Sequence, residues 1–310
     1  MLNIDRIQLT NGEYVKFLGI TSTDRTHLFC SNNNLKYLLK LTNNLDLIVT
    51  SLLGGELDKM QLISEEGNNE EKFQFYVKNE IVYLAYGKFP DKKGKWLLEQ
   101  MSNRYVELTR GRDVNQLSKI EINEIQIGFN KLVELILKEY LQLQEIKGMD
   151  QEIPYVEDAI RIDYLGLSSM FMGLISLLLG DEIGDDIEME FESPEGEKKM
   201  KESMITAKIQ AIVANTQQNT GVIPRWIAVK LAFQKYRFIT FKKYQNDYLL
   251  YLISEGNLGR VEHIEQLLDS DIKGVTKSPF SRNLKPFNKL RVDLENKFKK
   301  GRKFPLFKFK

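Results

Sequence analysis

The most regular hydrophobic pattern of the chain lies between residues 226 and 268. It contains three strand-like runs at close spacing, namely Trp226–Phe233, Tyr236–Tyr244 and Tyr248–Ser254. Glu255-Gly256-Asn257 interrupts the pattern, and apolar residues at three- and four-residue steps then predict an amphipathic helix from Leu258. We expect the side chain of Asn257 to cap this helix by accepting hydrogen bonds from its unpaired first amides. A three-strand meander followed by a helix favours a binding platform over a catalytic centre.

The three runs differ in the side chains that they would expose. The first run is predicted to have one apolar face, made by Ile227, Val229, Leu231 and Phe233. The second run carries Arg237, Lys242 and Lys243, which predicts an edge or half-exposed strand. Tyr248–Ile253 is apolar without interruption, which predicts a central strand covered on both faces.

The first half of the chain also contains strand patterns. Two short strands are predicted at Tyr14–Ser22 and His27–Cys30. A hairpin is predicted from Phe73–Val77 and Ile81–Tyr86, with the turn at Lys78-Asn79-Glu80. Together these patterns predict an antiparallel sheet in the first half.

Helical patterns separate and follow those strands. Helices are predicted over Leu45–Ile63, capped by Asn43 or Asn44, and over residues 94–106. A third, longer helix is predicted over Ile120–Ile146, and its broad apolar stripe indicates burial against a sheet or another helix. That stripe consists of Ile122, Ile125, Phe129, Leu132, Val133, Ile136, Leu137, Tyr140, Leu141 and Leu143. Gly148 and Pro154 then place a domain junction near residue 150.

The start of the second half is ambiguous. Ala159–Asp163 and Ser168–Leu179 fit either a strand or a helix. The apolar run Leu165–Leu179 is shorter than a membrane span, so we expect a buried element. Pro194-Glu195-Gly196 is predicted to be a loop, and Lys198–Gln218 a helix.

Composition favours two folded domains in a reducing compartment. The 310 residues are long for one core, and 42% are hydrophobic. The single cysteine, Cys30, excludes an internal disulfide framework and fits a cytoplasmic protein. No positively charged segment followed by an apolar core opens the sequence, so no signal peptide is expected.

The charges are unevenly distributed. Residues 273–310 contain 13 Lys or Arg residues against only Asp293 and Glu295, whereas residues 181–197 are acidic and contain no base. Aromatic residues alternate with the bases of this tail, and residues 289–303 fit a helix with Leu290, Leu294 and Phe298 on one side. The tail therefore fits an anionic membrane surface, nucleic-acid phosphates, or a helix packed on the body.

The sequence offers little sign of chemistry. Neither a phosphate-binding G-x-x-x-x-G-K-[ST] loop nor a G-x-G-x-x-G motif is present. The only histidines, His27 and His263, lie in different halves, and His27 with Cys30 gives too few ligands for zinc. We predict no catalytic, cofactor-binding or metal-binding residue, although a hydrolase that uses two carboxylates stays open as an alternative.

The run Tyr248–Ser254 followed by Asn257-Leu258-Gly259 resembles the closing strand and last helix of roadblock domains. The preceding helix and strands stand where that family places them. The first half is similar to the related longin fold, through its opening strands, Ser51-Leu52-Leu53-Gly54-Gly55, its hairpin and its second helix. The resemblance covers about 100 residues of each half, a typical domain length. Tandem arrangements of this kind are similar to archaeal proteins related to eukaryotic GTPase-regulating scaffolds.

The resemblance implies an α+β protein with two α/β/α layered domains, each built on a five-stranded antiparallel sheet. In each sheet the second strand would lie at one edge, followed by the first, fifth, fourth and third. Residues 1–150 would form a longin-like domain, residues 151–272 a roadblock-like domain, and residues 273–310 a basic, aromatic-containing tail. The acidic stretch 181–197 and this tail depart from the family pattern.

The implied function is a non-catalytic cytoplasmic scaffold without a cofactor. It would bind or regulate a small GTPase or pair with another roadblock or longin subunit, at a membrane surface or as a homodimer. The alternative is a nucleic-acid-binding accessory protein that acts through the tail. The residues expected to contact a partner are Arg237, Lys242, Lys243, Asn257, Leu258, Arg260, Lys289, Arg291, Lys297, Lys299, Lys300, Arg302 and Lys303.

Overall fold

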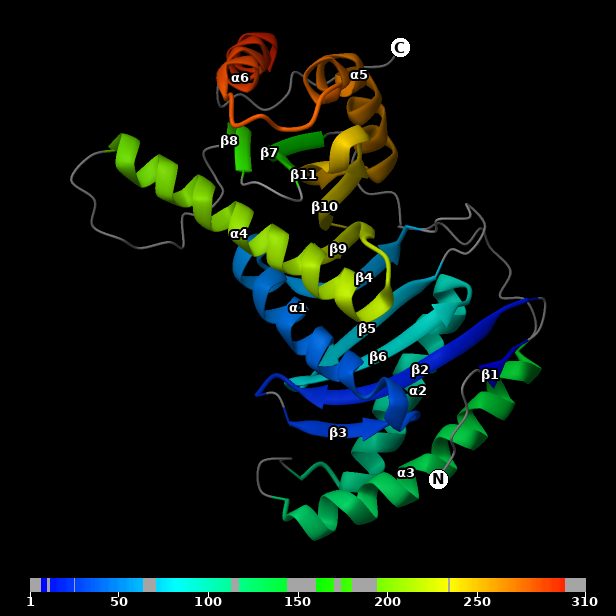
Figure 1. Cartoon of the computed structure of the whole chain (residues 1–310). Coiled ribbons are helices and arrows are strands. Elements are labelled where there is room, and N and C mark those ends of the chain that lie inside the picture. Colours follow the sequence, from blue (N-terminus) through cyan, green and yellow to red (C-terminus); the bar gives the residue numbers. More distant parts are fainter. Residues whose placement is uncertain are drawn as a thin grey trace. The chain divides into compact units, whose positions relative to one another are not determined.

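The structure is a computed structural model that describes residues 7–9, 12–24, 26–63, 71–112, 117–143, 160–169, 174–179, 194–233 and 235–298. Its described part contains six α-helices and eleven β-strands, and the strands pair antiparallel (Figure 1). The predicted α+β class is therefore confirmed. The number of strands predicted, five in each half, was too low, because β1 adds a strand to the first half.

The contacts between residues divide the chain into two units. Unit 1 consists of Met1–Leu47, Glu56–Glu152 and Thr216–Val222. Unit 2 consists of Ile48–Gly55, Ile153–Asn215 and Ile223–Lys310. Each unit thus combines most of one half of the chain with a short stretch of the other. The predicted domain boundaries at residues 150 and 272 stay predictions.

Unit 1 contains six strands: β1 (Ile7–Gln8), β2 (Tyr14–Ser22), β3 (His27–Cys30), β4 (Glu56–Leu62), β5 (Lys72–Lys78) and β6 (Ile81–Lys88). β6 pairs with β2 on one side and with β5 on the other, and β5 also pairs with β4. β1 and β3 both pair with β2, at its two ends. The order across the unit is therefore β3-β2-β6-β5-β4. The predicted bounds of β2 and β3 are confirmed.

β5 and β6 form the predicted hairpin. Asn79 and Glu80 occupy its turn with φ angles of 51° and 60°. Two consecutive residues in the left-handed region give a tight turn whose twist matches that of the paired strands. Lys78 and Ile81 pair directly beside this turn, so Lys78 belongs to β5 and not to the turn in which it was predicted.

The first helix differs from its prediction. α1 spans Tyr37–Leu53, whereas the apolar spacing predicted a helix over Leu45–Ile63. Gly54 and Gly55 follow α1 with φ angles of 68° and 74°. These left-handed conformations end a helix and suit glycine, which has no side chain to clash. The second part of the predicted helix is instead the strand β4.

The predicted helix caps were also wrong, because Asn43 and Asn44 lie inside α1. Asn43 is buried and donates from Nδ2 to Oγ1 of Thr21 on β2, at 2.9 Å. A Cβ atom added to Gly19 of β2 would lie 2.5 Å from Cδ2 of Leu39. Glycine at this position therefore allows α1 to approach β2 closely.

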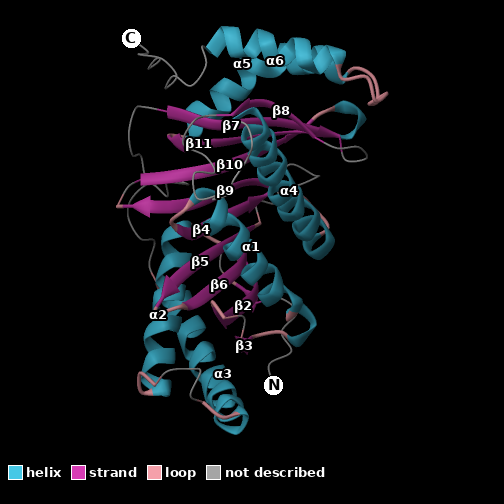
Figure 2. Ribbon diagram, turned by 90° about the vertical axis from the view of Figure 1, so that its left-hand side faces the viewer, coloured by secondary structure: helices cyan, strands magenta, loops and turns pink. Residues whose placement is uncertain are grey.

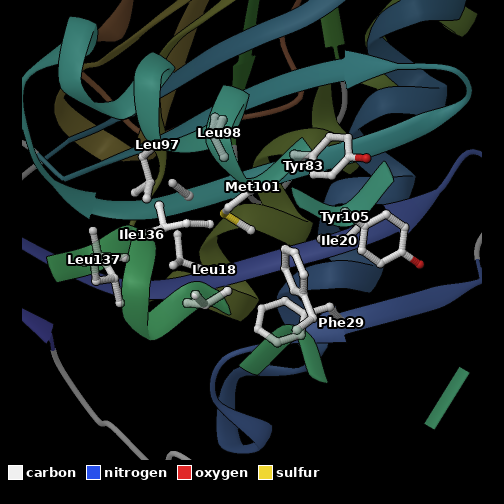
Figure 3. Close-up of a cluster of buried hydrophobic side chains, with 14 of the residues drawn as sticks. Leu18, Ile20, Phe29, Tyr83, Leu97, Leu98, Met101, Tyr105, Ile136 and Leu137 are labelled. Atoms are coloured by element: carbon white, nitrogen blue, oxygen red, sulfur yellow. The ribbon is translucent and has the colours of Figure 1, made fainter. Parts of the chain in front are cut away.

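Two further helices cover the other face of these strands. They are α2 (Asp91–Thr109) and α3 (Lys119–Gln142). Figure 2 shows α1 and α2 on opposite sides of the strands of unit 1. In Figure 3, Met101 of α2 and Ile136 of α3 meet Leu18 and Ile20 of β2 in one buried cluster. Because neighbouring residues of a strand point to opposite faces, these leucine and isoleucine side chains point away from α1.

A capping box starts α3. Oγ of Ser118 accepts from the backbone amide of Glu121, and the Glu121 carboxylate accepts from the amide of Ser118. This exchange satisfies amides that lack a partner inside the helix. The predicted start at Ile120 is one residue late, and the last positions of the predicted helix, from residue 144, lie outside the described residues.

Unit 2 contains five strands: β7 (Ile160–Ser169), β8 (Leu174–Leu179), β9 (Pro224–Ala232), β10 (Lys235–Lys243) and β11 (Tyr248–Gly256). β11 lies between β7 and β10, β8 pairs with β7, and β9 pairs with β10. The order is therefore β8-β7-β11-β10-β9. The ambiguous region before residue 180 consists of strands where it is described, and the predicted central position of β11 is confirmed.

Two expectations for the meander were wrong. β10 was predicted to be an edge or a half-exposed strand, and the edge alternative is wrong, because β10 has a neighbour on both sides. Lys243 at its end is exposed and Lys242 is half-buried, while Phe238 and Ile239 in its middle are buried. Phe233 follows the end of β9 and is 85% exposed, so it does not extend the apolar face of that strand.

The helices of unit 2 are α4 (Pro194–Thr220), α5 (Leu258–Thr276) and α6 (Lys285–Phe298). α4 begins at the segment predicted to be a loop, because proline is well accommodated in the first turn of a helix. α5 begins where predicted, and the side chain of Asn257 caps it by accepting from the amide of Arg260. α6 starts four residues before the tail helix predicted over residues 289–303, and the last positions of that prediction, from residue 299, lie outside the described residues.

These helices pack on the two faces of the unit 2 strands. α5 and α6 share a buried cluster with Tyr248, Leu250 and Leu252 of β11. On the other side, the hydroxyl groups of Tyr164 on β7 and Thr206 on α4 lie 2.7 Å apart and share a hydrogen bond. Side chains alternate along β11, so α4 and the pair α5–α6 cover opposite faces.

Candidate interaction surfaces

Arg237 is the centre of an ionic cluster in unit 2. It lies 3.2 Å from Glu255 of β11 and 3.6 Å from Asp163 of β7. Arg161 contacts the same two carboxylates, at 2.6 Å for Asp163 and 2.9 Å for Glu255. Arg237 also donates from Nη1 to the carbonyl oxygen of Leu53, at 2.6 Å, which satisfies an acceptor at the end of α1.

The electrostatics of this cluster indicate a structural role. Burial raises the pKa of Asp163, while Arg161 and Arg237 oppose this effect. Burial also acts to raise the pKa of Glu255, but contacts with Lys235 and both arginines outweigh it, so that pKa is lowered. Arg237 therefore pairs with one buried and one half-buried carboxylate of its own unit, and its predicted role as a partner contact stays a prediction.

The other predicted residues of β10 lie nearer to solvent. Lys242 pairs with Asp269 of α5 at 2.9 Å, and its ammonium group stands 5.5 Å from the ring centre of Tyr244. Lys243 is more exposed and lies 3.6 Å from Asp247. Exposed ion pairs contribute little to stability, so Lys243 is available to a partner at little cost.

Asn257, Leu258 and Arg260 stand together at the start of α5. Asn257 caps the helix, and Leu258 is buried in a small cluster with Trp226 and Phe238. Arg260 is half-buried and also forms interactions within the structure. The Asn-Leu-Gly sequence thus fixes the strand-to-helix junction, and of the three predicted contacts Leu258 is buried while Asn257 and Arg260 are half-buried.

The basic tail is partly built into unit 2. Figure 1 shows α6 beside β8 and α5. Phe287, Leu290 and Leu294 of α6 are buried, and Arg291 pairs with Glu202 of α4 at 2.9 Å. Of the three alternatives for the tail, packing on the body therefore holds for its described part.

The remaining predicted contacts of the tail differ in status. Lys289 lies on α6 and is exposed. Lys297 lies on the last turn of α6, where the structure does not describe its side chain. Lys299, Lys300, Arg302 and Lys303 lie outside the described residues.

The outer face of α3 is an apolar surface that the sequence prediction missed. Four large side chains on this helix are about half exposed or more: Ile120 at 73%, Ile127 at 54%, Leu135 at 53% and Leu141 at 45%. Leu141 was predicted to belong to the buried stripe, and this was wrong. Ile120, Ile127 and Leu135 are the apolar residues of this helix that the predicted buried stripe does not include. Their presence outside the stripe was the sequence signal that could have revealed this surface.

Unit 1 also contains paired polar groups. The ammonium groups of Lys59 and Lys72 both contact the carboxylate of Asp91 in the first turn of α2. Glu71 accepts from Tyr14 and Tyr86, and hydrogen bonds from these groups and Lys16 lower its pKa despite the opposing effect of burial. These contacts neutralise charge within the unit.

Cys30 and His27 stand on β3. Burial raises the pKa of the Cys30 thiol, which disfavours the reactive thiolate. Burial, with a contribution from Lys36, lowers the pKa of His27. Within the described part of the chain, no three His, Cys, Asp or Glu side chains are placed to hold a metal ion.

Comparisons with known proteins add no family to this picture. Neither a scan against protein-family models nor a search of curated proteins finds a match to the chain. Among the described helices, none is both long and apolar enough to cross a membrane.

Proposed function

We propose that this chain is a non-catalytic scaffold that binds a small GTPase through tandem longin- or roadblock-like domains. The observation that carries the proposal is an internal repeat. Apart from the short β1, each unit has two strands, a helix, three strands and two helices in chain order: β2, β3, α1, β4, β5, β6, α2, α3 and then β7, β8, α4, β9, β10, β11, α5, α6.

The strand order repeats as well. In each unit the second strand of the set lies at one edge, followed by the first, fifth, fourth and third. This is the order that the resemblance to longin and roadblock domains implies. We infer that both halves adopt one α/β/α layered architecture, in which helices cover the sheet and leave edges and outer helix faces for partners.

The distribution of polar groups supports binding rather than chemistry. The clusters around Arg237 and Asp91 pair opposite charges within a unit, as structural ion pairs do. The predicted contacts that reach solvent are exposed bases, with Lys243 near the end of β10 and Lys289 on α6. Such residues steer an acidic protein surface into contact and add specificity.

Direct binding to the small GTPases of the source organism tests the proposal. Each GTPase is immobilised in its GDP form and in a non-hydrolysable GTP form, and binding of the full chain is measured by biolayer interferometry. We expect one GTPase to bind with a preference for one nucleotide state. Replacing Lys243 and Lys289 together by Glu should weaken this binding, while Lys95→Glu, on the exposed side of α2, should leave it unchanged.

Two results would count against the proposal. One is an absence of binding to every GTPase in both states. The other is turnover of a substrate by the purified chain, which would place it among enzymes. Binding of RNA or DNA that weakens steeply with salt and disappears when residues 299–310 are removed would favour the nucleic-acid alternative instead.

A further inference from the structure

α3 has two apolar faces, and the fold of unit 1 uses only one. Its inner residues, including Phe129, Ile136 and Tyr140, are buried in one cluster with residues of β2, β3 and α2. Figure 3 shows Ile136 and Leu137 in this cluster. The outer residues Ile120 and Ile127 remain more than half exposed. A helix that has already buried a complete stripe does not need further large apolar residues, so their presence on the outer face requires another explanation.

The exposed residues lie along one side of the helix. Ile120, Ile127, Leu135 and Leu141 follow one another at steps of seven, eight and six residues. With 3.6 residues to a turn, these four positions fall within an arc of about 120° on the outer side of the helix. From Ile120 to Leu141, 21 steps at a rise of about 1.5 Å give an apolar strip about 32 Å long.

This strip is complementary to itself when it is reversed. Ile127 precedes Lys131 by four residues and Leu135 follows it by four. Glu124 precedes the same lysine by seven residues and Lys138 follows it by seven. An antiparallel copy centred on Lys131 would therefore set isoleucine against leucine and glutamate against lysine, twice each.

The pairing would join two charged side chains that are exposed on the outer face of α3. Among the described residues, neither Glu124 nor Lys138 forms an ion pair within the chain, and both are exposed. The two copies of Lys131 would face each other at the centre. The two Lys131 ammonium groups would repel each other. Glu134 lies about one turn beyond Lys131, so the Glu134 carboxylate of each copy is within reach of Lys131 in the other copy and offsets this repulsion.

We propose that α3 is a homodimerisation helix, which pairs antiparallel with α3 of a second copy around a two-fold axis at Lys131. The surface fits an identical partner because the two-fold axis places Ile127 against Leu135 and Glu124 against Lys138 of the other copy. A single pair of helices buries less than about 1,200 Å², so the dimer belongs to the weaker class of interfaces. This inference does not rest on the proposed GTPase function.

Sedimentation equilibrium of the full chain, from about 1 to about 100 µM, tests the dimer at concentrations suited to a weak interface. We expect a monomer–dimer equilibrium, and we expect Ile127→Asp with Leu135→Asp to raise the dimer dissociation constant by at least about 100-fold. The thermal midpoint should not fall, since both side chains are already exposed. Val292→Asp is the matched control, because Val292 is 53% exposed on α6, and it should leave the dimer intact.

A charge exchange tests the register. Glu124→Lys and Lys138→Glu should each weaken the dimer because each sets two like charges together. The double variant should restore it, because the opposite charges then face each other again.

Disulfide trapping tests the direction of the helices. In a Cys30→Ser background, Lys131→Cys should form a disulfide-linked dimer on mild oxidation. Lys138→Cys should not, because the two copies of residue 138 would stand about 21 Å apart along the axis, from 14 residues at about 1.5 Å each.

Three results would each overturn the inference. They are a wild-type chain that stays monomeric at about 100 µM, a dimer that Ile127→Asp with Leu135→Asp does not weaken, and equal cross-linking at positions 131 and 138. If the wild-type chain stayed monomeric but bound a GTPase, the dimer inference would be wrong and the proposed GTPase function would still hold.

Discussion

Arg291 on α6 donates from Nη2 to Oε1 of Glu202 on α4, at 2.9 Å. Glu202 is only 8% exposed, and Arg291 also contacts Glu295 on its own helix. A base that the sequence assigned to a partner contact thus joins two helices of the same unit. Together with the buried leucines of α6, this pair makes the described part of the tail a structural element.

The buried leucines of α6 should be needed for stability. We expect Leu294→Ala to lower the free energy of unfolding by about 2–5 kcal/mol, because Leu294 is 1% exposed and its removal leaves a cavity. Val292→Ala on the exposed side of α6 should change it by less than about 0.5 kcal/mol. Urea denaturation followed by circular dichroism measures both. Equal, small effects would show that α6 is not docked in solution.

Removing Arg237 should destabilise unit 2. Arg237→Ala leaves Asp163 and Glu255 with fewer compensating charges, and we expect a loss of about 3 kcal/mol. Lys243→Ala, which breaks an exposed pair, should cost less than about 1 kcal/mol. Thermal denaturation compares the two variants. If Arg237→Ala instead weakened partner binding without lowering the unfolding temperature, Arg237 would be a contact residue after all.

Gly166 on β7 should not tolerate a side chain. A Cβ atom there would lie 2.3 Å from the ring of Tyr251, so Gly166→Ala forces the ring to move and should cost about 1–3 kcal/mol. Gly274 in α5 meets no atom within 4 Å of such a Cβ. Gly274→Ala should therefore stabilise the chain by about 0.5–1 kcal/mol through helix propensity alone. Chemical denaturation of the two variants should shift in opposite directions.

The carboxyl group of Glu265 should make stability depend on pH. Burial raises its pKa, against the opposing effects of Thr240 and Lys242. A raised pKa in the folded state means that stability is greatest below the ordinary pKa of Glu and is lost as the pH rises through the folded value. We expect Glu265→Gln to remove this loss and to be more stable than the wild type at neutral pH.

The measurement is the free energy of unfolding between pH 4 and pH 8 for the wild type and the variant. Glu139→Gln, at an exposed position of α3, is the control and should follow the wild type. A Glu265→Gln variant that is less stable than the wild type at neutral pH would show that the ionised carboxylate stabilises the fold.

Local patterns predicted much of the fold. β2, β3, the hairpin of β5 and β6, and the capped start of α5 were all found, because their turn and cap residues define them locally. The boundary between α1 and β4 was not found, since Leu57 and Met60 fit helical spacing as well as a strand. Only the left-handed glycines Gly54 and Gly55 separate the two elements.

The candidate contacts were less predictable, because charge alone does not say where a side chain will lie. Arg237 and Arg291 looked like surface bases, yet both pair with buried or half-buried carboxylates from distant parts of the chain. Conversely, Ile127 and Leu135 looked like ordinary helix residues and are exposed. Such outcomes depend on which elements become neighbours, and the pattern of one helix or strand does not contain that information.

The division of the chain has a practical consequence for experiments on its halves. Residues 48–55 group with the second half and residues 216–222 with the first. A protein cut at residue 150 would yield two fragments that each lack a segment of their own unit. Producing both fragments in the same cell, so that they reassemble by complementation, is therefore a sounder route than purifying either alone.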